Sequence, residues 1–313
     1  MKKDTGFRRI LFAVNASEHS AAAVPVVAAI AAASHATVRV LHVWSPDDAR
    51  LGRHEEVAGA LEESELVDSV VDKLRAAGVA ADEESAAAMS DQVATLIRER
   101  ADSFDADLIA IGNRGLSELH NILVPSRTQQ VLAHADRPVL AVRHTGRRVR
   151  VHTIDDFGRS SGIDHRFRRV VLALDGDSDH ACAVHACIDI ARPAASEVDV
   201  IHFGARDDPQ IRAVVTGLAT YGLKATWQRA DDDKHPADEI IGAVSRAGAD
   251  LLIIGARQAG AWSLFVGDVT HRVLESCPCP VIVAPLPSQA KGPCTELDSR
   301  EPSHSVRSKR TDS

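Results

Sequence analysis

Hydrophobic residues gather in short runs along the chain, and these runs alternate with longer amphipathic stretches. The aliphatic and β-branched run at 8–14 predicts a buried strand. The alanine-rich stretch at 17–33 predicts a helix, with Ser17 as its N-cap and Pro25 as a point where it could bend. The same reasoning predicts strands at 37–43, 79–87, 107–111 and 138–142, and helices at 56–76, 91–103 and 126–135.

This pattern occurs twice. RRILFAVNASEHSAAAV at 8–24 matches RRVVLALDGDSDHACAV at 168–184, and the matched segments that follow keep the same order. DLIAIG begins at Asp107 and DLLIIG at Asp250, while RPVLAV begins at Arg137 and CPVIVA at Cys279. Strands that alternate with helices favour parallel sheets covered on both faces. We therefore expect an α/β protein with two doubly wound five-stranded parallel-sheet (Rossmann-like) domains in tandem.

The expected organisation follows from the repeat. The first domain covers 1–143 and the second 167–285, with a polar linker at 144–166 and a disordered polar tail at 286–313. A tandem also favours an intrachain pseudo-dimer, for which we expect the last strands of the two repeats to pair, or alternatively a homodimer.

The composition argues against a nucleic-acid partner and against membrane insertion. The net charge is −8 and aromatic residues make up 4%, which argues against a nucleic-acid partner. No apolar run reaches the ~20 residues that span a bilayer, and no secretory signal is recognisable, so we expect no membrane insertion. Five cysteines without a disulfide spacing fit a reducing, cytoplasmic location.

Candidate ligand-binding residues lie where strands are expected to end. Asn15 follows the first strand, and Gly112, Arg114 and Gly115 follow the fourth. Ser126, Arg127 and Thr128 open the next helix. Helix N-termini and glycines at strand ends suit a phosphate group.

The segment GNRGLSELHNILVPSRTQQVLAHADRPVLAV resembles the G-x2-G-x9-G-(S/T) signature of the universal stress protein family, and RRILFAVNASEHS resembles the first strand of that family. The resemblance covers most of 7–143 and 167–285. It implies a stress-response regulator. The loop of the first repeat offers no evident general base, so we expect no enzymatic activity beyond slow, incidental ATP hydrolysis. The resemblance also implies an ATP or other adenine-nucleotide ligand, with Mg²⁺ as a potential companion, and an unidentified protein partner.

The family pattern transfers to the first repeat with departures. Asn15 stands where the family has an adenine-contacting Asp, and Val43 matches a backbone contact to adenine. Gly112, Gly115 and Ser126 match the motif, but Pro125 replaces its third glycine and removes one N–H donor.

The second repeat departs further. Asp175, Gly255 and Gly267 match the family, whereas Phe203 replaces a small residue. Asp268 replaces the final Ser/Thr, where we expect it to cap the helix and repel a triphosphate. Nucleotide is therefore expected in the first repeat only.

Two further clusters have alternative interpretations. His180, Cys182, His185 and Cys187 are poorly spaced for a metal and are interpreted as core cysteines and surface histidines. Cys277 and Cys279 flank a proline before the last strand, and a redox role is the alternative to a purely structural one. His42 and His202 repeat on the second strands, which favours a role in the fold.

Three functions remain to be compared. The first is a nucleotide-responsive regulator, the second a nucleotide-free interaction scaffold, and the third an enzyme of a related α/β class. The third ranks last because the sequence has neither a Walker lysine after a Gly-rich loop nor a recognisable catalytic cluster.

Overall fold

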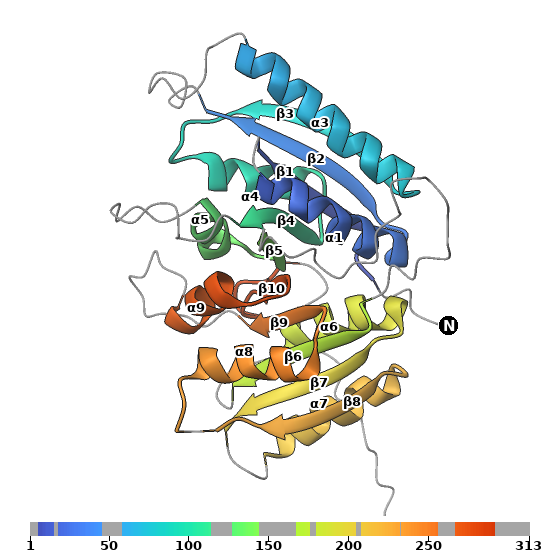
Figure 1. The fold of residues 1–313 in the computed structure, drawn as a ribbon, viewed down its shortest axis with the longest axis vertical. Coiled ribbons are helices and arrows are strands. Elements are labelled where there is room, and N and C mark those ends of the chain that lie inside the picture. Colours follow the sequence, from blue (N-terminus) through green and yellow to red (C-terminus); the bar gives the residue numbers. More distant parts are fainter. Residues whose placement is uncertain are drawn as a thin grey trace, which may run out of the picture.

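The computed structural model describes residues 6–15, 18–45, 58–113, 127–143, 167–175, 180–204, 208–231, 233–255 and 267–291, with the backbone alone at 18–19, 58–64 and 127. The first repeat contains β1 (Arg9–Val14), α1 (Glu18–Ser34), β2 (Thr37–Trp44), α3 (Ala58–Ala76), β3 (Ala80–Ala87), α4 (Val93–Ser103), β4 (Leu108–Asn113), α5 (Arg127–His134) and β5 (Val139–Arg143). The second contains β6 (Arg169–Asp175), α6 (Ala181–Ala194), β7 (Glu197–Phe203), α7 (Pro209–Thr220), β8 (Lys224–Arg229), α8 (Pro236–Ala247), β9 (Leu251–Gly255), α9 (Asp268–Ser276) and β10 (Val281–Ala284). Figure 1 shows one repeat above the other.

The strands of each repeat form a doubly wound parallel sheet, which confirms the predicted fold class. The order is β3-β2-β1-β4-β5 in the first repeat and β8-β7-β6-β9-β10 in the second. Every strand pair within a repeat is parallel. In each repeat the second and third strands are added on one side of the first strand, and the fourth and fifth on its other side. This reversal creates a topological switch point between β1 and β4 and another between β6 and β9.

The two sheets join through their last strands. β5 and β10 pair antiparallel, with Val139 opposite Val283 and Ala141 opposite Val281, so the ten strands form one continuous sheet. Figure 1 shows this junction between the repeats, where the green and red strands meet. The expectation that the last strands pair within one chain is confirmed.

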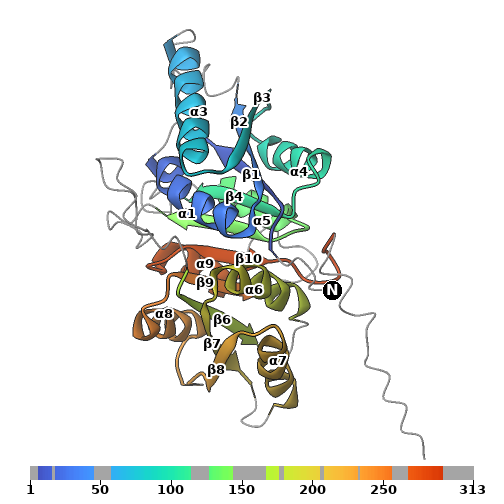
Figure 2. The same ribbon diagram turned by 90° about the vertical axis from the view of Figure 1, so that its right-hand side faces the viewer.

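Helices cover both faces of the twisted sheet (Figure 2). On one face, buried residues of α1, α3, α6 and α7 form a single core with the strands. On the other face, the core is formed with α4, α5, α8 and α9. Each core runs across the β5–β10 junction, so the two repeats share their hydrophobic interior.

Most of the predicted elements are confirmed to within about two residues, because central parallel strands are continuous apolar runs. β1 is buried along nearly its whole length, whereas β3 lies at the sheet edge and is largely exposed or half-buried. α1 continues on both sides of Pro25. The proposed N-cap Ser17 and the linker at 144–166 lie outside the described residues.

A carboxylate fastens the start of the first strand in each repeat. Asp107 accepts the backbone N–H groups of Arg8 and Arg9 at 2.7 and 3.1 Å. Asp250 accepts those of Arg168 and Arg169 at 2.8 and 3.0 Å. In both repeats, the aspartate of the repeated Asp-Leu pair therefore binds two backbone N–H groups at the start of the neighbouring strand.

The chain after Pro285 differs from the expected disordered tail over its first six residues. Residues 286–291 form a turn that packs on the first repeat. The Lys291 N–H donates to the carbonyl of Asp136 at 2.8 Å, and its ammonium lies 3.2 Å from the Asp136 carboxylate. This segment therefore fastens the end of the second repeat to the first. Residues 292–313 lie outside the described part of the chain.

Candidate functional site

Three predicted ligand-binding residues of the first repeat come together at the carboxyl ends of adjacent strands. Asn15 directly follows β1, Val43 is the penultimate residue of β2, and Gly112 is the penultimate residue of β4. The strand register places β1 between the other two. We call these three residues the repeat-one strand-end site. It lies at the switch point, where open parallel sheets bind their ligands.

The side chain of Asn15 is held in place by α1. The Ser20 hydroxyl donates to Asn15 Oδ1 at 2.8 Å and accepts the Asn15 backbone N–H at 3.0 Å. Ser20 is buried, so this reciprocal pair fixes the turn between β1 and α1. The oxygen that accepts from Ser20 could equally belong to a carboxylate, so the turn is compatible with either Asn or Asp.

The helix expected to carry phosphate contacts begins where the sequence places it. α5 starts at Arg127, and Thr128 is buried in its first turn. A helix N-terminus supplies free N–H groups and a partial positive charge. Arg114, Gly115 and Ser126, the other predicted phosphate-side residues, lie outside the described residues, as does the side chain of Arg127.

The residue after Gly112 joins the site to the second repeat. Asn113 is buried, and its Nδ2 donates to the backbone carbonyl of Leu274 in α9 at 3.0 Å. Asn113 occupies a variable position of the glycine motif. No pattern in the sequence could have paired it with a residue 161 positions away.

The equivalent residues of the second repeat also gather at strand ends. Asp175 ends β6, and Phe203 ends β7 as its partner in the register, while Gly255 ends the neighbouring β9. Asp175 Oδ1 lies 3.9 Å from Nε2 of His180, and the side chain of Asp175 is 25% exposed. The carboxylate that matches the family residue therefore has a histidine beside it.

A second histidine lies deeper in the same region. His202 is completely buried on β7, and its Nε2 lies 3.3 Å from the carboxylate of Asp208. Burial lowers the pKa of His202, against the opposing effect of Asp208. A neutral, enclosed imidazole fits the role in the fold that its repetition suggested, which stays a prediction.

The expectation that Asp268 caps its helix is wrong. Gly267 is the N-cap of α9 and no side chain caps it, whereas Asp268 is the first helical residue. Its Oδ2 lies 3.1 Å from Nε2 of His235, and His235 Nδ1 accepts the N–H of Ala237 as the N-cap of α8. His235 therefore donates from Nε2 and holds the carboxylate between the two helices.

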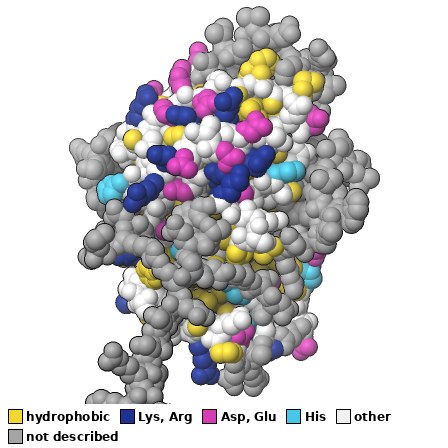
Figure 3. Space-filling view, turned by 180° about the vertical axis from the view of Figure 1, so that it is seen from behind, with side chains coloured by type: hydrophobic (Ala, Val, Ile, Leu, Met, Phe, Trp, Pro, Cys, Tyr) yellow, Lys and Arg dark blue, Asp and Glu magenta, His cyan; other side chains and the backbone are white. Residues whose placement is uncertain are grey.

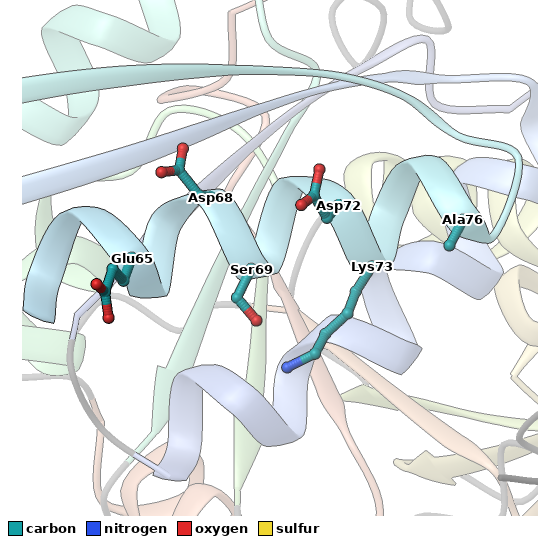
Figure 4. Close-up of a pocket in the computed structure, with 6 residues that line it drawn as sticks. All are labelled: Glu65, Asp68, Ser69, Asp72, Lys73 and Ala76. Atoms are coloured by element: carbon teal, nitrogen blue, oxygen red, sulfur yellow. The ribbon is translucent and has the colours of Figure 1, made fainter.

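Two features of the described surface lie apart from these sites. Figure 3 shows basic and acidic side chains interspersed over the first repeat on the face in view. A shallow open hollow of about 500 Å³ lies along α3 (Figure 4), and its described lining residues all belong to that helix: Glu65, Asp68, Ser69, Asp72, Lys73 and Ala76. Acidic residues predominate there, and none of the predicted site residues lines it.

The cysteine–histidine cluster of α6 is part of the fold. Cys182 and Cys187 are completely buried in the core, as expected. His180 and His185 are half-buried, so the expectation of surface histidines is wrong. Within the described ranges, no group of three or more potential metal ligands occurs.

Comparison with known proteins agrees with this architecture. The model of the universal stress protein family matches residues 6–143 and 166–285. The chain therefore belongs to the universal stress protein family, with two family domains in tandem. A universal stress protein of Thermus aquaticus is 34% identical over 140 residues, which cover 44% of this chain and 99% of that relative.

Solved structures show the same tandem fold. A universal stress protein from Archaeoglobus fulgidus matches 91% of this chain and 99% of its own, with a TM-score of 0.68 and 19% identity. The cytoplasmic domain of a prokaryotic cation chloride cotransporter matches 93% of this chain and 99% of its own, with a TM-score of 0.54 and 12% identity. Among the described helices of the present chain, none is long and apolar enough to cross a membrane.

Proposed function

We propose that this universal stress protein is an adenine-nucleotide-responsive regulator that binds ATP, alone or with Mg²⁺, in its first repeat. The observation that carries the proposal is the convergence of Asn15, Val43 and Gly112 at the switch point of the first sheet. α5 begins in the same repeat and supplies a helix N-terminus for the phosphates. Asn15 would contact the adenine base, and the backbone at Val43 would complete that contact.

The second repeat is proposed not to hold a triphosphate. In the position of the motif Ser/Thr it carries the Asp268 carboxylate, which accepts from His235. A second negative charge about 4 Å from a carboxylate costs about 4 kcal/mol at an effective dielectric constant of 20. Asp175 is also flanked by His180. These contacts within the chain involve the side chains that a nucleotide would need to bind.

Titration calorimetry with MgATP tests the proposal. The wild type is expected to bind, and Asn15→Ala is expected to weaken binding about tenfold, because a hydrogen bond to the base is worth about 1.4 kcal/mol. Asn15→Asp restores the family residue and is expected to bind at least as tightly as the wild type. Asp175→Ala makes the equivalent change in the second repeat and is expected to leave binding unchanged.

A nucleotide-free interaction scaffold is the second candidate. The replacement of a motif glycine by Pro125 and the His235–Asp268 contact both favour it. Wild-type protein that binds no MgATP in calorimetry, yet retains a protein partner in nucleotide-free pull-downs, would support this alternative and contradict the first. In both cases we propose a binding protein rather than an enzyme.

A further inference from the structure

Two cysteines lie in sulfur contact beside the junction of the repeats. Cys277 is the C-cap of α9, and Cys279 lies two residues before β10, with Pro278 between them. Their Sγ atoms are 3.6 Å apart, and both are free thiols. Cys277 is buried, whereas Cys279 is partly exposed. Cys279 is therefore the more accessible residue of the pair.

The first repeat shows that this turn forms without cysteines. Ala135 and Arg137 occupy the matching positions there. The carbonyl of Pro138 accepts the N–H of Ile109 at 3.0 Å, and the matching carbonyl of Pro280 accepts the N–H of Leu252 at the same distance. This backbone hydrogen bond is the same in both repeats, so it does not require thiols in the turn.

The two repeats use different side chains at this turn. In the first, Arg137 is buried, donates to Asp136 at 2.8 Å and also pairs with Asp102. In the second, two polarisable thiols replace this ionic cluster. The hydrogen bond with Cys279 and the nearby Arg143 guanidinium lower the pKa of Cys277, against the effect of burial. The same hydrogen bond, together with burial, raises the pKa of Cys279, so Cys277 is the thiol of the pair that ionises first. A cationic neighbour favours the thiolate, which is the reactive form.

We propose that Cys277 and Cys279 are a peroxide-sensitive pair that closes to an intramolecular disulfide. One thiolate attacks a hydroperoxide oxygen, breaks the O–O bond and becomes a sulfenic acid while hydroxide leaves and is protonated to water. The second thiol then attacks that sulfur, forms the S–S bond and releases a second water molecule. Two thiols are oxidised and one hydrogen peroxide is reduced to two waters, so no further reactant is required.

The remaining cysteines supply internal controls. Cys182 and Cys187 are completely buried in α6, and burial raises the pKa of Cys187 to about 12, so both are expected to resist peroxide. Trypsin separates the three sets: 273–291 contains Cys277 and Cys279, 170–206 contains Cys182 and Cys187, and 292–300 contains Cys294. Each set can therefore be followed in one digest.

The experiment treats the full chain with hydrogen peroxide, quenches with acid, alkylates under denaturing conditions and weighs the tryptic peptides. The proposal predicts that peptide 273–291 loses about 2 Da and takes up no alkyl group. Its thiols should disappear at least about tenfold faster than those of 170–206. Dithiothreitol should restore alkylation of both thiols.

Three cysteine variants test whether the disulfide joins Cys277 to Cys279. In Cys294→Ser the loss of about 2 Da should persist, while in Cys277→Ser and in Cys279→Ser it should vanish and dimedone should trap a sulfenic acid on the remaining thiol. The proposal is overturned if the two thiols of peptide 273–291 are lost no faster than those of peptide 170–206. It is equally overturned if the peptide becomes cross-linked to 292–300 or accumulates only sulfinic and sulfonic acids.

Discussion

Asn113 of the first repeat donates from Nδ2 to the backbone carbonyl of Leu274 in the second, in a buried hydrogen bond of 3.0 Å. In a regular helix that carbonyl would accept an N–H from four residues further on, but that residue is Pro278, which has no N–H. Asn113 therefore supplies a donor that the proline removes. This bond links the end of β4, beside Gly112, to the last turn of α9.

Replacing Asn113 is expected to destabilise the junction. Asn113→Ala would leave a buried carbonyl without this donor and should lower the free energy of unfolding by about 1–3 kcal/mol. Asn113→Asp should cost more, because it aims a carboxylate at a carbonyl oxygen. Urea unfolding followed by circular dichroism measures both. Equal stability of Asn113→Ala and the wild type would show that the bond contributes nothing.

A second contact across the repeats predicts a pH dependence. The N–H of Gly6 donates to Asp189 of α6 at 3.0 Å. Burial raises the pKa of Asp189 to about 6, and burial likewise raises that of Asp107 to about 6, with Asp189 as a lesser contributor. In the unfolded chain both groups titrate near pH 4. Their contribution to stability is thus fully present below about pH 4, declines as the pH rises towards 6, and is flat above that.

Asp189→Asn keeps the oxygen that accepts from Gly6 and removes the charge. It should raise the free energy of unfolding at pH 7.5 by on the order of 1–2 kcal/mol, since Asp189 is partly exposed and the full effect is screened. The difference between variant and wild type should shrink as the pH falls from 6 to 4. A difference that stays constant over this range would contradict a raised pKa of Asp189 in the folded protein.

Gly6 is required by its conformation and its surroundings. Its φ is +129°, and a Cβ there would lie 2.8 Å from Cβ of Ser34. Gly6→Ala therefore adds a clash to the strain and should cost about 2–4 kcal/mol. Gly78→Ala is the matched control, since Gly78 has a φ of +78° but no atom within 4 Å of the added Cβ. It should cost only about 1 kcal/mol, and thermal unfolding that shifts equally in both variants would exclude the clash.

Sequence alone predicted the elements well because their signals are local. β1, β2 and β4 are apolar runs, and the repeat of Asp107 as Asp250 fixed the alignment of the two halves. The pairing of β5 with β10 was also expected, since a tandem favours pairing within the chain. These features depend on neighbouring residues or on internal repetition, both of which can be seen in one sequence.

The missed features depend on side chains that meet across the fold. The contact of His235 with Asp268 joins two helix starts, and Asp268 does not cap α9 because Gly267 occupies the N-cap position. The bond from Asn113 to Leu274 and the packing of Lys291 on Asp136 join the two repeats. Each arises only after the sheet has brought distant segments together, so no spacing in the sequence indicates it.

The contact between His235 and Asp268 gives a further prediction for the second repeat. Asp268→Ala removes a charge that favours the α9 N-terminus and the acceptor for His235, so it should lower the free energy of unfolding by about 0.5–1 kcal/mol. His235→Ala should have a similar effect, and the double variant should cost less than the sum of the two. A double-mutant cycle in urea measures this coupling, and strict additivity would show that the contact has no energetic weight.

The most direct test of the central claim is to denature freshly purified protein, separate the released small molecules and count adenine nucleotide per chain by mass spectrometry, with and without prior incubation in MgATP. The account predicts close to one nucleotide per chain after incubation, and markedly less for Asn15→Ala. Two per chain would show that the second repeat binds despite Asp268. None, together with no heat of binding, would contradict nucleotide binding and leave the scaffold as the function to pursue.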